Sequence, residues 1–181
     1  MKLMKREAAI HLTSLVLFFL FLSLLKGWYT DFRFLWFWLG GIFGAFLLDI
    51  DHLVYSLFLN PHELTSQRVA HLVKQRRFQE TADLLARTKH ERTKVILHSI
   101  EFEAIFLILA LFVITSCGSL FGVGLVLGVM THFLVDQFFD LQSLGHLNNW
   151  FRQFPIRLEK KDATLFWIGS VLVVLLLGVM L

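Results

Sequence analysis

The amino-acid sequence predicts an all-α, polytopic membrane protein with about five transmembrane helices and a cytoplasmic amphipathic helical segment. The chain of 181 residues is 56% hydrophobic and only 17% charged, whereas soluble domains are about one quarter charged. Its mean hydropathy is +0.67, and its apolar runs reach the length of about 20 residues that a helix needs to cross a bilayer. We therefore expect residues 1–181 to form a single integral membrane domain.

Apolar segments separated by polar links define the predicted spans, which are residues 8–25, 34–59, 95–116, 120–139 and 164–181. The first span follows a short basic leader, but it is long and no small-residue cleavage site comes after it. We therefore interpret it as a retained helix rather than as a signal peptide. Neither this span, whose polar residues include His11, nor the last span is assigned a site residue.

Glycines recur at helical spacing in two of the predicted spans. Gly40 and Gly44 are four residues apart in the second span, and a second set accompanies the fourth span: Gly118, Gly122, Gly124 and Gly128. Small residues let helix backbones approach each other closely in a membrane. We therefore expect a close helix–helix contact at each of these two faces.

Residues 61–94 form the one long polar segment, which we predict to be a cytoplasmic, basic, amphipathic helical insert between the second and third spans. Apolar residues recur in it at near-helical spacing, so we expect a pair of amphipathic helices lying on the membrane. Attraction to anionic headgroups explains the basic residues, so membrane lipids are expected partners and nucleic acid is not. His62, His71 and His90 are expected to be solvated.

The distribution of lysine and arginine predicts the orientation. With five spans and a cytoplasmic N-terminus, the cytoplasmic segments hold three, eight and four of these residues, which is 15 of the 17 in the chain. The outer segments hold only Lys26 and Arg33. Because basic residues concentrate on the cytoplasmic side of membrane proteins, we predict an inner-membrane protein with its N-terminus in the cytoplasm and its C-terminus outside.

The stretch Asp49-Ile50-Asp51-His52 places two carboxylates and an imidazole inside the second apolar span. One ionisable residue in hydrocarbon costs roughly 3 kcal/mol or more, so three neighbouring ones need a partner. A divalent cation turns their mutual repulsion into coordination. The alternative is that Asp49 and Asp51 mark the end of the helix and are hydrated among the lipid headgroups.

Ionisable residues of three spans share one predicted depth. With a rise of about 1.5 Å per residue, Asp49, His132 and Asp136 lie roughly 20–25 Å below the outer ends of their spans. His98 and Glu101 lie within about 10 Å of the inner end of theirs. His132 and Asp136 are also one helical turn apart, so they share a face. We therefore predict a metal site at the inner leaflet, with the ligands Asp49, Asp51, His52, His98, His132 and Asp136.

Mixed imidazole and carboxylate ligands favour zinc or manganese as the bound divalent ion. Cys117 is the only cysteine, which excludes a disulfide within the chain and a thiolate site. His62-Glu63 lacks the second histidine, four residues after the first, that a zincin helix requires.

Three motifs resemble those of the predicted membrane-bound metal-dependent hydrolases, often called YdjM-like: Asp49-Ile50-Asp51-His52, Leu97-His98-Ser99 and His132-Phe133-Leu134-Val135-Asp136. The resemblance covers roughly residues 41–140 and implies a small polytopic inner-membrane metalloenzyme. In that family a His-Arg pair often stands a few residues before the His-Ser pair. Here His90-Glu91-Arg92 is further upstream and split, so His90 is not among the predicted ligands. The His132–Asp136 helix is also similar to helices of zinc-dependent phospholipases C, which implies phosphoester chemistry.

The leading hypothesis is a hydrolase that holds one or two divalent ions, which would lower the pKa of bound water to about 7. Glu101 or Glu103 would act as general base or further ligand, and Ser99 would orient a ligand or cap the third span. A phospholipid or other amphiphilic phosphoester in the cytoplasmic leaflet is the expected substrate. The alternatives are a divalent-metal or proton transporter and a non-catalytic scaffold with a structural metal. Against transport, no polar path to the outer face is evident in the sequence.

Overall fold

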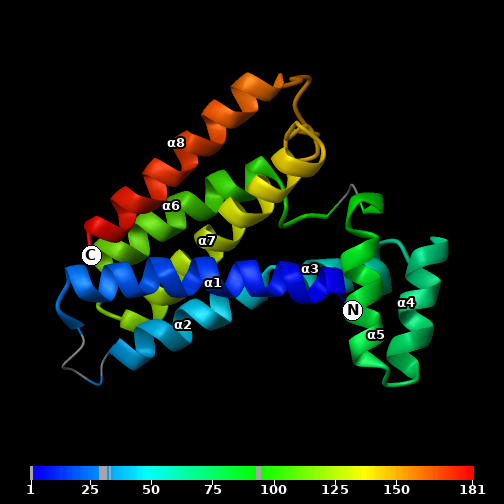
Figure 1. Ribbon diagram of the computed structural model, residues 1–181, viewed down its shortest axis with the longest axis horizontal. Coiled ribbons are helices and arrows are strands. Elements are labelled where there is room, and N and C mark those ends of the chain that lie inside the picture. The colour runs from blue at the N-terminus through cyan, green and yellow to red at the C-terminus, as the bar shows by residue number, and fades with distance from the viewer. Residues whose placement is uncertain (1, 29–31, 33, 93–94) are drawn as a thin grey trace.

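The computed structural model describes the backbone of residues 2–28, 32, 34–92 and 95–181, with the side chains from residue 8 onward except that of His90 (Figure 1). Every regular element in this part of the chain is helical, which confirms the all-α prediction. The elements are α1 (Lys2–Leu25), α2 (Phe34–Leu47), α3 (Asp49–Val54), a π-helix (Tyr55–Leu59), α4 (Leu64–Lys74), α5 (Phe78–Arg87), a 3₁₀ helix (Lys89–Glu91), α6 (Ile100–Ser116), α7 (Leu120–Ser143) and α8 (Lys160–Val179).

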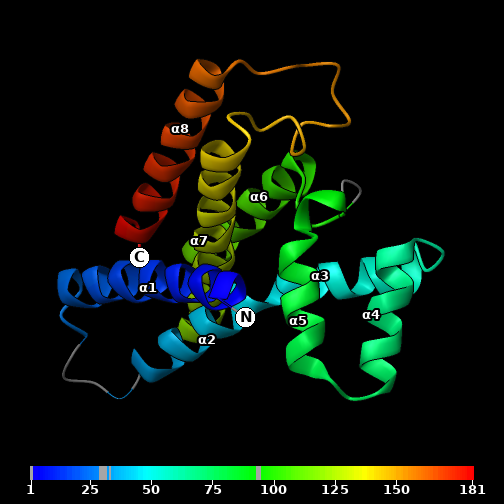
Figure 2. The ribbon, with the colours of Figure 1, turned by 45° about the vertical axis from the view of Figure 1, so that its right-hand side comes forward.

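Helix α7 is the centre of the bundle. It contacts α1, α2, α6 and α8, and α1 runs across it in both ribbon views (Figures 1 and 2). In α7, 72% of the most apolar membrane-length stretch is buried, against 22% in α1 and in α8. Phe133 of α7 packs edge-to-face on Phe106 and Trp150. The polar side chains of α7 are therefore enclosed by protein on several sides.

The closest helix–helix contact joins α2 and α7 through the glycines of both faces. A Cβ atom built on Gly40 or Gly44 would overlap a backbone carbonyl oxygen of α7, that of Phe121 or Leu125. Conversely, a Cβ atom on Gly124 would overlap the carbonyl oxygen of Phe37, and one on Gly128 that of Gly41. The expectation of small-residue packing is confirmed for these glycines, whereas Gly118 has open space and a Cβ atom on Gly122 would lie nearest to Val113 and Ser119.

Within the described residues, the helices that are long and apolar enough to cross a membrane number four: Ala8–Leu25, Phe34–Leu59, Leu120–Ser143 and Lys160–Val179. Helix α6 is equally apolar but has only 17 residues. Large apolar side chains point outward from α6, where Ile105, Ile108 and Phe112 are 67%, 71% and 64% exposed. A surface of this kind suits contact with lipid rather than water. The chain is thus a membrane protein, with a span count close to the predicted five.

Two predicted spans differ in detail from the structure. The second keeps its predicted bounds, but a single turn residue, Leu48, separates α2 from α3. The third helix begins at Ile100 rather than at Val95. The segment before it forms a run of bends, and side chains from elsewhere bind its backbone. Asp51 accepts a hydrogen bond from the Leu97 amide, at 2.5 Å, and Arg152 donates to the Val95 carbonyl, at 2.7 Å.

Helices α4 and α5 form the expected amphipathic pair. They stand side by side as a hairpin at one end of the bundle (Figures 1 and 2), where α5 contacts α1 and α4 contacts the π-helix. At the other end of α1, the Lys26 ammonium donates to the carbonyl oxygens of Val179 and Leu181, at 3.0 and 2.7 Å. The hairpin and the C-terminus therefore lie at opposite ends of α1.

Candidate metal centre

Asp136 of α7 is the focus of the candidate site. Its side chain is 4% exposed, and three imidazoles and one ammonium group surround it. Oδ2 lies 2.9 Å from Nε2 of His98 and 3.2 Å from Nε2 of His132. Oδ1 lies 3.4 Å from Nε2 of His11 and 2.5 Å from Nζ of Lys89. We call His11, His98, His132 and Asp136 the His–Asp cluster.

Four elements bring these side chains together. His132 and Asp136 are one turn apart on α7, as expected from their spacing. His11 comes from the first turns of α1 within the bundle, and its ring centroid lies 4.4 Å from that of His132. His98 comes from the bends before α6, and Lys89 from the 3₁₀ helix after α5. The cluster therefore exists only when the bundle is assembled, and Lys89 reaches it only when the hairpin is in place.

The Asp49–His52 motif surrounds the cluster on the α3 side. Oδ1 of Asp49 lies 3.8 Å from Nε2 of His132, and this aspartate is 59% exposed. Asp51 is buried, and its Oδ2 lies 3.7 Å from Nδ1 of His98. A carboxylate behind the far nitrogen of a histidine fixes that ring's orientation and tautomer. The structure therefore places Asp51 behind His98 rather than against Asp136.

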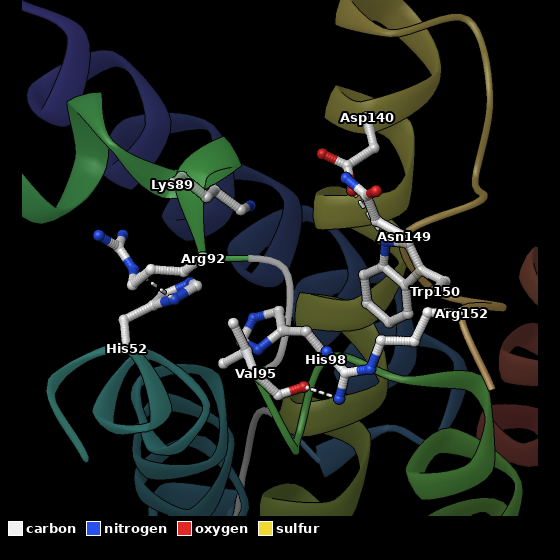
Figure 3. A pocket seen from close by; sticks show the side chains of 9 residues that line it. All are labelled: His52, Lys89, Arg92, Val95, His98, Asp140, Asn149, Trp150 and Arg152. Carbon is white, nitrogen blue, oxygen red and sulfur yellow. Dashed lines mark hydrogen bonds between the residues drawn. The ribbon is translucent and has the colours of Figure 1, made fainter. Parts of the chain in front are cut away.

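His52 lies beside the cluster in a pocket that is lined by several positively charged side chains (Figure 3). Its ring stacks on that of His98 with centroids 4.7 Å apart, and Arg92 Nε donates to its Nδ1 at 3.3 Å. Lys89 and Arg152 line the same pocket, which has a volume of about 40 Å³. Burial lowers the pKa of Arg92 to about 10, so the guanidinium remains charged at neutral pH. We call this space the basic pocket.

The two predicted catalytic glutamates are not part of the lining of the cavities beside the cluster. Gln137 Nε2 donates to Oε2 of the buried Glu103 at 2.6 Å. Glu101 has both carboxylate oxygens buried without a hydrogen-bond partner among the described residues. Ser99 caps α6, because its side chain accepts a hydrogen bond from the Phe102 amide. This confirms the capping alternative for Ser99.

The structure describes the side chains of two of the three histidines in the insert. His62 and His71 are exposed, as expected, and Gln75 contacts the ring of His71 at 2.8 Å. The side chain of His90 lies outside the described residues.

His11 was not among the predicted ligands, but the structure places it in the cluster. His11 is close to the inner end of its span, about 5 Å from residue 8 along a helix, so the depth rule applied to the other spans would have found it. Lys89 and Arg92 were also missed as site residues. They lie beside the cluster because the hairpin packs against the bundle, and no residue spacing in the sequence indicates that contact.

The donor set fits a divalent cation. His11, His132 and Asp136 each offer a ligand atom, and these atoms all lie within 4.8 Å of one another. Both ring nitrogens of His132 are buried and make no hydrogen bond within the described part of the chain. Its Nε2 faces two carboxylates, those of Asp49 and Asp136. Imidazole and carboxylate oxygen are ligands that zinc and manganese accept.

Comparison of this chain with protein-family models, curated proteins and solved structures finds no match.

Proposed function

We propose that the protein is a membrane-bound, metal-dependent hydrolase that acts on a phosphoester of a lipid or amphiphile. The observation that carries this proposal is the buried Asp136 carboxylate with three imidazole Nε2 atoms within 3.4 Å. Lys89 pairs with one oxygen of this carboxylate, whereas the buried ring nitrogens of His132 make no hydrogen bond within the described residues and can serve as ligand atoms. His11, His132 and Asp136, joined by His98, would hold a divalent ion, with zinc or manganese the metals that suit these ligands.

When bound, such an ion polarises a scissile bond and supplies a nucleophile from water at neutral pH. The chain's own residues supply the rest. Asp51 orients His98, while Lys89 and Arg92 place positive charge beside the cluster, which favours an anionic phosphoester. Asp49, half-exposed and next to His132, replaces Glu101 and Glu103 as our candidate proton acceptor.

The proposed location is the cytoplasmic membrane, with the N-terminus inside and the C-terminus outside. The Lys/Arg distribution supports this orientation. The position of Leu181 beside Lys26 also supports it, because Lys26 follows the end of α1 that is opposite to the N-terminus. The cluster then lies at the inner leaflet, next to the basic insert. The three motifs that resemble those of the YdjM-like hydrolases fall within or beside this cluster, and we base the proposal of hydrolase activity in part on that resemblance.

A panel of lipid, nucleotide and sugar phosphoesters tests the proposal with protein reconstituted in vesicles. Turnover of at least one class should stop on chelation and return when zinc or manganese is restored. Asp136→Asn should abolish it, because the change removes the charge at the centre of the cluster. His71→Ala, an exposed histidine, is the matched control and should be fully active.

Turnover that survives both chelation and Asp136→Asn would refute the mechanism. Metal that is retained without turnover on any of the phosphoesters would support a scaffold with a structural ion. Metal-dependent flux of ions across the vesicle membrane would support the transporter alternative.

A further inference from the structure

A second, mostly apolar cavity reaches the His–Asp cluster from the side of the hairpin. Its volume is about 410 Å³, near the lower end of the range of about 300–1,000 Å³ found for ligand pockets. Apolar side chains of four helices (α1, α2, α3 and α5) form most of its wall: Leu12, Leu15, Phe46, Ile50, Phe78 and Leu85. Its polar lining includes His11, Asp49, His52, Lys89 and Asp136. We call this space the apolar cavity.

Apolar residues of the cavity wall reach the outer surface of the bundle. Phe46, Ile50 and Phe78 are 56%, 52% and 65% exposed although they line it. Two of these residues belong to the second membrane-length segment. In a membrane, side chains at such a surface contact acyl chains, so a hydrocarbon chain can enter from the leaflet without crossing water.

The apolar cavity and the basic pocket meet at the cluster, because His52 and Lys89 line both. The basic pocket adds Arg92 and Arg152 (Figure 3). Its one carboxylate, that of Asp140, accepts a hydrogen bond from Nε1 of Trp150 at 2.8 Å. Arg92 is bonded to neutral acceptors, namely His52, the Thr88 hydroxyl and the Leu85 carbonyl. Such a site is complementary to an anion.

We propose that the protein binds a single-chain anionic amphiphile, with its hydrocarbon chain in the apolar cavity and its phosphate at the basic pocket. This inference rests on the proposed function for what happens next, but binding itself requires no turnover. The small volume favours one chain over the two of an ordinary phospholipid. The bond between head and chain would then lie beside Asp136.

Photo-crosslinking tests the inference with the full chain in phosphatidylcholine vesicles. The probe is dodecyl phosphate with a diazirine at the end of its chain, and the competing probe is the corresponding neutral alcohol. Crosslinks should map to peptides of α1, α3 and α5, and the phosphate probe should label them more strongly than the alcohol. The mapping needs no variant. It is carried out with a chelator present, because hydrolysis of the phosphate probe would release the alcohol that serves as the comparison.

Ala86→Phe fills the apolar cavity from α5 and should reduce labelling roughly tenfold, the change that overpacking by about 1.4 kcal/mol produces. Ala70→Phe, on the exposed side of α4, is the matched control and should label normally. Equal labelling by both probes, or labelling unaffected by Ala86→Phe, would overturn the inference. Specific labelling without hydrolysis of any phosphoester would instead reject the proposed function and leave the binding site intact.

Discussion

The substitution Asp51→Asn tests whether Asp51 orients the ligand His98 or is itself a metal ligand. In the structure, Asp51 Oδ2 lies 3.7 Å from Nδ1 of His98 and accepts the Leu97 amide at 2.5 Å. Replacing a carboxylate behind a ligating histidine typically weakens metal binding about 10–100-fold. This corresponds to about 1.4–2.8 kcal/mol of binding free energy. The asparagine retains an oxygen for the Leu97 amide, so the fold should persist.

The assay is competition for zinc between the purified protein and a fluorescent chelator of known affinity. Asp136→Asn should lose far more affinity than Asp51→Asn, because Asp136 faces three imidazoles directly. Asp162→Asn, an exposed aspartate at the start of α8, is the matched control and should bind as the wild type does. Unchanged affinity in Asp51→Asn, or a loss as large as that of Asp136→Asn, would refute the assigned role.

Three further predictions concern topology and stability. The exposed Cys117 should react with a membrane-impermeant maleimide in intact cells, and labelling confined to inside-out vesicles would contradict the proposed orientation. Gly44→Leu should lower the free energy of unfolding by about 1–3 kcal/mol or more, since the new side chain would overlap the backbone of α7. Gly169→Leu is the control and should leave the free energy of unfolding unchanged, because Gly169 faces open space. Equal losses for the two variants in denaturant titrations would disprove the contact between α2 and α7. Ser99→Ala should lower the free energy of unfolding by about 1 kcal/mol through the lost helix cap, and turnover should stay near normal. A variant that is stable but inactive would show that Ser99 takes part in the chemistry.

Much of the architecture could be predicted because it depends on local pattern. Apolar runs of membrane length predicted the helices, and the spacing of the glycines predicted the faces through which α2 and α7 pack. The His132–Asp136 pair followed from helical periodicity alone. These features require no knowledge of which elements meet.

The rest of the site depends on tertiary contacts that one sequence does not encode in any spacing. Lys89 reaches Asp136 only because the hairpin folds back on α1, and Asp51 lies behind His98 only because Leu97 offers it an amide. Glu101 and Glu103 share the depth of the cluster, but depth does not determine the direction in which a helical side chain points. His11 is the exception, since its depth was readable from the sequence.

The metal content of the purified protein tests the central claim most directly. Protein prepared without chelators and analysed by elemental mass spectrometry should contain a divalent first-row metal. His11→Ala and His132→Ala should each lose most of it, because each removes a ligand on a different helix, whereas His71→Ala should retain it in full. A wild-type protein that binds no divalent metal even when it is supplied, or equal metal content in all three variants, would contradict the metal centre proposed at Asp136.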